Sequence, residues 1–125
     1  MTVFVIPGRA VPKARARLDR RSGRFYTPDT TSDFETVVAW EAKRAGVRLI
    51  PKGVPISLSI FEYRVRRSQK TAFPLSRPDV DNAGKAIMDA LNGIAYADDS
   101  QVVIFHVEKQ WGTHEHIVVD VHAIY

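Results

Sequence analysis

The stretch RPDVDNAGKAIMDALNGIAYADD, residues 77–99, decides the fold of this chain. Its middle part repeats apolar residues at the spacing of a helix that packs on a core. The residues predicted to face the core are Ala83, Ile87, Ala90 and Leu91. The residues predicted on the opposite face are Asp81, Lys85 and Asp89. Asp81 or Asn82 is expected to cap the start of this helix, and Gly93 is expected to end it.

Strands are predicted on both sides of this helix. Apolar residues alternate at 2–6, from 56 onward, at 103–107 and at 117–123, as in strands with one buried face. After residue 60 the apolar residues change parity, which a bulge or a strand buried on both faces would explain. A turn around Gly112 is expected between the last two strands.

A second helix is predicted over residues 32–45. Ser32 and Glu35 match a capping box, and Gly46 is placed to stop the helix. The resulting order is strand, basic arm, helix, strand, helix, strand, strand. We therefore expect one small α+β (mixed α/β) domain over residues 1–125, with a mixed β-sheet of about four strands and two helices.

The composition excludes several classes of protein. With 45% hydrophobic and 26% charged residues, the chain is typical of a soluble globular protein. It has no apolar run of about 18 residues and no signal-peptide pattern, so we expect a cytoplasmic protein without a membrane partner. The absence of cysteine excludes disulfides, zinc-thiolate sites and cysteine nucleophiles.

Positive charge is concentrated in an arm at about residues 8–27. Between residues 9 and 24, seven cations are opposed only by Asp19, and the whole chain has a net charge of +4. Such a segment favours a phosphate backbone as partner, and Phe25 and Tyr26 add aromatic rings that can stack on bases. A second basic cluster contains Arg64, Arg66, Arg67 and Lys70.

Five carboxylates fall within residues 79–99 of this basic protein. If the backbone before the helix is extended, Asp79 and Asp81 point to the same side, and Lys85 follows one turn later. A loop could bring Asp98 or Asp99 alongside them. Clustered hard oxygen ligands favour Mg²⁺ or Mn²⁺ and phosphoryl chemistry. The alternative is that these acids only cap a helix and form a solvated turn.

The sequence matches two other kinds of metal site poorly. The sequence starting at Asp79 begins like an EF-hand calcium loop, but alanine occupies the fifth and twelfth positions, at Ala83 and Ala90. The histidines do not match a zinc motif, and we expect them on strands.

Three segments of the chain, taken together, resemble the RusA family of bacterial Holliday-junction resolvases, which are often carried by prophages. The matching segments are Arg77-Pro-Asp79-x-Asp81-Asn82-x-x-Lys85, Asp89-Ala-Leu91-Asn92 and Asp98-Asp99-x-Gln101-Val102-Val103. The segment from Ile6 to Arg17 is also similar, so the resemblance covers most of the chain.

The resemblance implies a homodimer that nicks four-way DNA junctions symmetrically in recombination and repair, with Mg²⁺ as cofactor, Mn²⁺ as a substitute, and no small-molecule cofactor. The implied catalytic residues are Asp79, Asp81, Asp99 and Lys85. The implied metal ligands are Asp79, Asp81 and Asp99, with Asp98 as the other candidate for the third position. The predicted DNA contacts are Lys13, Arg15, Arg17, Arg20, Arg21, Arg64, Arg66, Arg67 and Arg77. The alternatives are a nuclease for flaps or other branched DNA, and a junction-binding module without catalysis.

Overall fold

The computed structural model describes residues 2–11, 17–26, 29–67 and 70–125, with only the backbone of residues 17, 25–26 and 29–32. Its elements confirm the predicted α+β fold and are, in order, β1 (Thr2–Pro7), β2 (Arg17–Leu18), β3 (Phe25–Tyr26), α1 (Asp29–Arg44), β4 (Ile56–Val65), α2 (Val80–Ala90), the 3-10 helix η1 (Asp99–Gln101), β5 (Val102–Gly112) and β6 (His116–Ala123). Within the described residues, no helix is long and apolar enough to cross a membrane.

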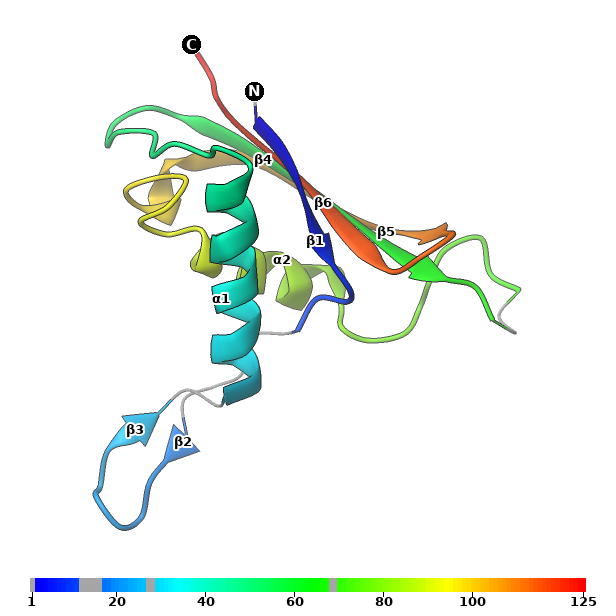
Figure 1. Cartoon of the computed structure of the whole chain (residues 1–125), viewed down its shortest axis with the longest axis horizontal. Coiled ribbons are helices and arrows are strands. Elements are labelled where there is room, and N and C mark those ends of the chain that lie inside the picture. The colour runs from blue at the N-terminus through cyan, green and yellow to red at the C-terminus, as the bar shows by residue number, and fades with distance from the viewer. Residues whose placement is uncertain (1, 12–16, 27–28, 68–69) are drawn as a thin grey trace.

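Four strands form one mixed sheet in the order β1-β6-β4-β5. The pairs β1–β6 and β6–β4 are antiparallel, whereas β4 and β5 are parallel. Parallel neighbours need a crossover connection, and α2 provides it. Both helices lie on the same side of the sheet (Figure 1). The short strands β2 and β3 form a separate hairpin that projects beyond the N-terminal end of α1 (Figure 1).

The core lies between the helices and one face of the sheet. All four predicted core residues of α2 are buried there, and α1 contributes Phe34, Val38 and Ala42. The predicted start of α1 is wrong by three residues, because the helix begins at Asp29 and Ser32 lies in its first turn. Several residues of the capping type precede Ser32, so the local sequence offers more than one start.

The change of parity in β4 has a different cause from either one expected. The buried face of β4 continues from Ile60 through Glu62 and Arg64, which are 1% and 0% exposed. Phe61 and Tyr63 lie on the opposite face and are half-buried. A charged pair therefore occupies core positions, and the register shift of the β4–β5 pair lies earlier, between Ile56 and Ser57.

Gly84 lets α2 approach the sheet closely. A Cβ atom at this position would lie 2.7 Å from the end of the Phe105 ring and 2.8 Å from a methyl group of Val107. Both contacts are shorter than van der Waals separation. The absence of a side chain at Gly84 therefore sets the distance between α2 and β5.

The change Gly84→Val should destabilise the fold. The added side chain must displace α2 from β5, so we expect a loss of about 3 kcal/mol in the free energy of unfolding. Urea denaturation measures this loss. Lys85→Val is the matched control, because it places the same residue at the neighbouring exposed position of the helix. Equal stability of the two variants would contradict the close approach.

Candidate functional site

The N-terminal end of α2 carries the first two acidic residues. Asp79 is the N-cap, with extended backbone angles (φ −67°, ψ 157°), and its side chain makes no capping hydrogen bond. Asp81 already lies in the first helical turn. The expectations that Asp81 or Asn82 caps the helix, and that both acids sit on extended backbone, are therefore wrong. The carboxylate of Asp79 is not used to cap the helix.

A cavity of about 260 Å³ opens at this helix end. Its lining residues are Arg77, Pro78, Asp79 and Asn82. The cavity thus combines an exposed cation, an exposed carboxylate and an amide. The positive end of the α2 dipole favours negative charge in the first turn, where Asp81 lies.

Three polar side chains continue along the solvent side of α2. Lys85 is exposed one turn after Asp81, and Asp89 is half-buried one turn after Lys85. Residues four apart on a helix are neighbours on its surface, so Lys85 lies between the two acids. The sequence-based expectation for this face is confirmed.

The C-terminal end of α2 holds a second group of polar residues. The hydroxyl of Tyr96 donates to the carbonyl oxygen of Met88 at 2.6 Å. Burial raises the pKa of Tyr96, and the charges of Asp99 and Asp89 raise it further. Asn92 Nδ2 donates to Asp99 Oδ2 at 3.4 Å. Asp89, Asn92 and Asp99 therefore gather around Tyr96.

The structure separates the roles of Asp98 and Asp99. Asp98 caps η1, because its carboxylate accepts from the backbone N–H of Ser100 at 3.3 Å and from the Ser100 hydroxyl. These bonds, and the charge of Lys52, lower the pKa of Asp98. Gln101 completes the capping box by accepting from the backbone N–H of Asp98 at 3.0 Å.

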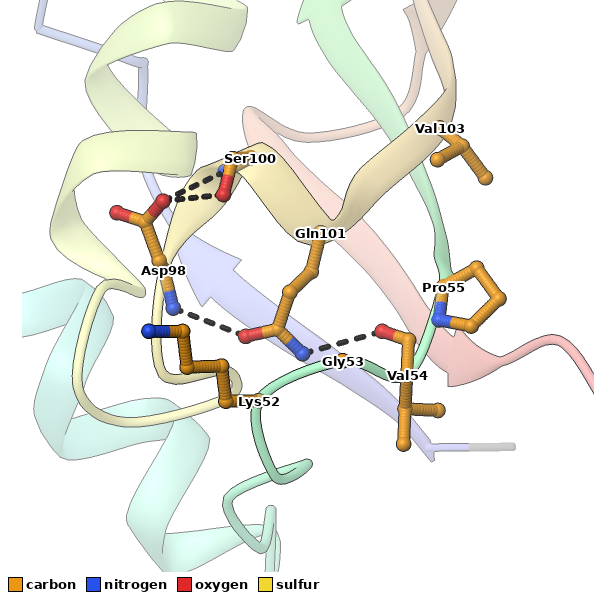
Figure 2. Close-up of a pocket in the computed structure, with 8 residues that line it drawn as sticks. All are labelled: Lys52, Gly53, Val54, Pro55, Asp98, Ser100, Gln101 and Val103. Carbon is orange, nitrogen blue, oxygen red and sulfur yellow. Dashed lines mark hydrogen bonds between the residues drawn. The ribbon is translucent and has the colours of Figure 1, made fainter.

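Asp98 faces a different cavity from the one at Asp79. Figure 2 shows Asp98, Ser100 and Gln101 around a space of about 340 Å³, together with Lys52 and the residues that lead into β4. Gln101 Nε2 donates to the carbonyl oxygens of Pro51 and Val54, at 2.9 and 3.1 Å. These bonds hold η1 against the loop before β4, so Asp98 has a structural role there.

The two acidic groups lie at opposite ends of α2. A helix of 11 residues is about 16 Å long. Asp79 and Asp81 mark its start, whereas Asp99 contacts Asn92 just past its end. Within the part of the chain that the structure describes, no three acidic or histidine side chains are close enough to hold one metal ion. Asp99 therefore does not lie alongside Asp79 within this chain.

Sequence reasoning left Asp89 and Asn92 out of the candidate site. Both belong to the group around Asp99, through Tyr96 and through the hydrogen bond from Asn92. The helical spacing of Asp89 after Lys85 was visible in the sequence. The contact of Asn92 with Asp99 was not, because it depends on the path of the intervening loop.

The hairpin presents part of the predicted basic arm. Asp19 forms its turn by accepting from the backbone N–H of Arg21 at 2.9 Å and from the Ser22 hydroxyl at 3.0 Å, and these bonds lower its pKa. Arg20, Arg21 and Arg24 are exposed around this turn. Lys13 and Arg15 lie outside the described residues, and only the backbone of Arg17 is described.

The second basic cluster divides into exposed and buried members. Arg66 and Arg67 are exposed at the end of β4, and the guanidinium of Arg66 lies 5.0 Å from the centre of the Trp111 ring. Arg64 is fully buried, and its donors are used within the chain. The prediction that Arg64 contacts DNA does not fit this placement, because a phosphate cannot reach it.

Comparison with known proteins supports one family. A family model described as Endodeoxyribonuclease RusA matches residues 7–122, which include the hairpin, both helices and all the candidate acids. The chain is 31% identical over 136 residues to the uncharacterized protein YqaN of Bacillus subtilis (strain 168), covering 97% of this chain and 95% of that protein. It is 30% identical over 89 residues to a protein of Lactococcus phage r1t named crossover junction endodeoxyribonuclease rusA, covering 69% of this chain and 67% of that protein.

The cap at Asp98 predicts a pH-dependent effect on stability. Asp98→Ala should lower the melting temperature at pH 7, whereas Asp98→Asn should retain most of it, because asparagine is also a good cap. The lowered pKa means that the charged carboxylate stabilises the fold above about pH 4 and that this contribution is lost as the pH falls further. The difference between the wild type and Asp98→Ala should therefore narrow in acid. Asp99→Ala is the control, and an equal loss in both alanine variants would argue against the cap.

Proposed function

Because the chain belongs to the RusA family of endodeoxyribonucleases, which hydrolyse phosphodiester bonds, we propose that it resolves four-way (Holliday) DNA junctions by paired nicks in a Mg²⁺-dependent reaction. The observation that carries the proposal is the cavity at the start of α2. Arg77 lines this cavity together with Asp79, whose carboxylate makes no capping hydrogen bond. The name of the phage relative supports a junction as substrate. Its place of action is then the bacterial cytoplasm.

The donor atoms fit a hard divalent ion. Asp79, Asp81 and Asp99 offer carboxylate oxygens, which Mg²⁺ prefers and for which Mn²⁺ can substitute. Nucleases of this family are generally metal-dependent. We assign these three residues as the ligands, and exclude Asp98 because its carboxylate is used at η1. A bound ion would supply an activated water and neutralise charge on the phosphate.

Cationic side chains would bind the scissile phosphate and the rest of the DNA backbone. Lys85 projects from the same helix face as Asp81 and would hold the scissile phosphate, while Arg77 would bind a neighbouring phosphate at the cavity. The arginines around the hairpin turn, with Arg66 and Arg67, would bind the DNA backbone electrostatically. Lys13, Arg15 and Arg17 belong to the same arm in sequence.

A homodimer would complete the site. Asp99 lies about one helix length from Asp79 in its own chain, so three ligands for one ion need a different source for the third carboxylate. A two-fold axis that places two α2 helices antiparallel would bring Asp99 of a second copy to Asp79 and Asp81. It would also create two equivalent sites, as two symmetric nicks require.

The first test is cleavage of a labelled synthetic four-way junction, with linear duplex and flap controls, with and without Mg²⁺. We expect paired symmetric nicks only in the junction and only with the metal. Asp81→Asn should lower the cleavage rate on the order of 10³-fold while junction binding is retained or tightened, because one ligand and one negative charge are removed. Asp98→Asn is the matched control and should cleave normally.

Three outcomes would contradict this assignment. Tight junction binding without any product in Mg²⁺ or Mn²⁺ would favour a binding module without catalysis. Faster cleavage of the flap than of the junction would favour a nuclease for other branched DNA. Loss of junction binding in Asp81→Asn would make Asp81 a structural residue.

Mixed dimers test whether the site is shared. An Asp81→Asn chain and an Asp99→Asn chain, co-expressed with different tags and purified through both, should recover nicking of one strand. One of the two shared sites then holds Asp81 and Asp99 intact, whereas each parent dimer holds no intact site. A mixed dimer as inactive as its parents, beside an active wild type, would show that the acids act within one chain.

Cross-linking tests the same arrangement without activity. Because the chain has no cysteine, Asn82→Cys in one tagged chain and Ser100→Cys in the other give a clean background. A disulfide between the two chains requires Cα atoms within about 7 Å. We expect this cross-link on mild oxidation, and none with Lys52→Cys in place of Ser100→Cys.

A further inference from the structure

Arg64 makes an unusual set of contacts for a residue in the core of a sheet. Its side chain is fully buried, and the whole guanidinium is engaged. Nε donates to Glu62 Oε1 at 2.9 Å, and Nη2 forms an ion pair with the same oxygen at 2.8 Å. Nη1 donates to the Ser76 hydroxyl at 2.8 Å and to the Ser76 carbonyl oxygen. The side chain therefore connects β4 to the loop that precedes α2.

The contacts with this loop follow the backbone residue by residue. Nη1 also donates to the carbonyl oxygen of Arg77 at 3.2 Å, and Nη2 donates to that of Pro78 at 3.1 Å. Three successive carbonyl groups thus converge on one guanidinium. Lys109 Nζ adds a second donor to the Ser76 carbonyl oxygen, at 3.0 Å. The next residue along the chain is Asp79.

Stability alone does not explain this charged pair. Burying an ion pair costs desolvation that its attraction often fails to offset, and apolar pairs of similar volume are commonly as stable or more so. Glu62 Oε2 is buried and has no hydrogen-bond partner among the described residues, which adds to the cost. A better explanation is orientation: Glu62 holds the guanidinium of Arg64 so that its remaining N–H groups point at the loop carbonyls.

The guanidinium of Arg64 fixes the backbone that lines the cavity. The side chains of Arg77 and Asp79 line this cavity, and Arg64 donates to the carbonyl oxygens of Arg77 and Pro78. These two hydrogen bonds restrict the backbone positions from which both side chains extend. Misplacement of reacting groups by about 1 Å can cost on the order of 10²-fold in rate.

We propose that Arg64 is a positioning residue that sets Asp79 and Arg77 for cleavage, with Glu62 orienting its guanidinium. The proposal rests on the proposed nuclease function. Arg64 touches neither DNA nor metal in this assignment, and acts only through the backbone of residues 76–78.

The test replaces the buried pair by an apolar one. Glu62→Leu and Arg64→Met together should lower the melting temperature, because the carbonyl oxygens of Arg77 and Pro78 lose their donor. The junction affinity should stay within about threefold of the wild type, since no exposed cation is lost. The single-turnover cleavage rate should fall about 100-fold. The cleavage rate of Arg64→Lys should fall less than that of the apolar variant, because the ammonium keeps the charge and some of the hydrogen bonds. It should still fall below the wild-type rate, because an ammonium cannot reach all three carbonyl oxygens. The matched control is Glu41→Leu with Arg44→Met, another acid–arginine pair, on α1, which should cleave normally.

Amide hydrogen exchange gives a readout that does not require cleavage. The backbone N–H of Ala83 donates to the Asp79 carbonyl oxygen at 2.9 Å in the first bond of α2. In the apolar variant this amide should exchange faster, while amides of β4 and β6 remain protected. If the apolar variant does not fold, exchange of the Ala83 amide is compared between Arg64→Lys and the wild type instead.

The outcomes separate this proposal from the function on which it rests. A wild type that cleaves, with an apolar variant that cleaves equally well, overturns the positioning role. A rate that falls only in proportion to junction affinity or melting temperature also overturns it, because Arg64 would then be structural. An inactive wild type overturns the proposed function, and unchanged exchange at Ala83 would then overturn the positioning role separately.

Discussion

The parallel pairing of β4 with β5 is the constraint on which the rest of the arrangement depends. Because the two strands run in the same direction, the chain leaves one end of the sheet after β4 and must return to the other end before β5. The connecting helix α2 therefore runs back along the strand direction, and its two ends lie near opposite ends of the strands. Asp79, at the start of α2, is therefore separated from Asp99, just past its end, by about the helix length. This topology divides the acidic residues into two groups, and the proposed dimer is the arrangement that would bring them together.

The buried residues of β4 change from apolar to charged at the point where a loop, instead of helices, packs on the strand. Beside Leu58 and Ile60 the sheet is covered by helices, whose backbone groups are satisfied internally, and the buried side chains are apolar. Beside Glu62 and Arg64 it is covered by the loop before α2. A buried loop brings carbonyl groups that need donors, and arginine offers several on one side chain. Charged residues in this part of the core follow from packing a loop on a sheet.

The sequence predicted the elements whose signals are local. The apolar spacing of α2 identified its core face, because Ala83, Ile87 and Leu91 follow one helical stripe. The start of α1 was wrong because capping residues precede Ser32. Arg64 was misassigned to DNA because a charged residue after a strand is usually exposed. Its burial depends on contacts with residues 76–78, which local patterns do not reveal.

The sequence indicates the candidate site as a set of residues but not as an arrangement. The pattern around Asp79 and Asp81 predicts two metal ligands, and both residues are exposed in the structure. The choice between Asp98 and Asp99 needed the backbone, since only the 3-10 turn shows that Asp98 is a cap. The separation of Asp99 from Asp79 needed the strand order, which alternation along one strand does not give.

The distribution of charge indicates which side of the sheet meets DNA. The face of the sheet that no helix covers carries, among the described residues of its four strands, no lysine or arginine. Two of its histidines pair with carboxylates, His106 with Glu108 at 2.8 Å and His122 with Asp120 at 3.2 Å. A third, His116, stacks on Tyr63. A polyanion gains nothing on such a surface, because counterion release requires cations. The hairpin and α2 lie instead on the helix side of the sheet (Figure 1). The hairpin carries exposed arginines, α2 carries the exposed Lys85, and the exposed Arg77 precedes α2. DNA that approaches this side meets the cations first and the acids of α2 within the same surface, which is the order that a metal-dependent nuclease on a basic scaffold requires.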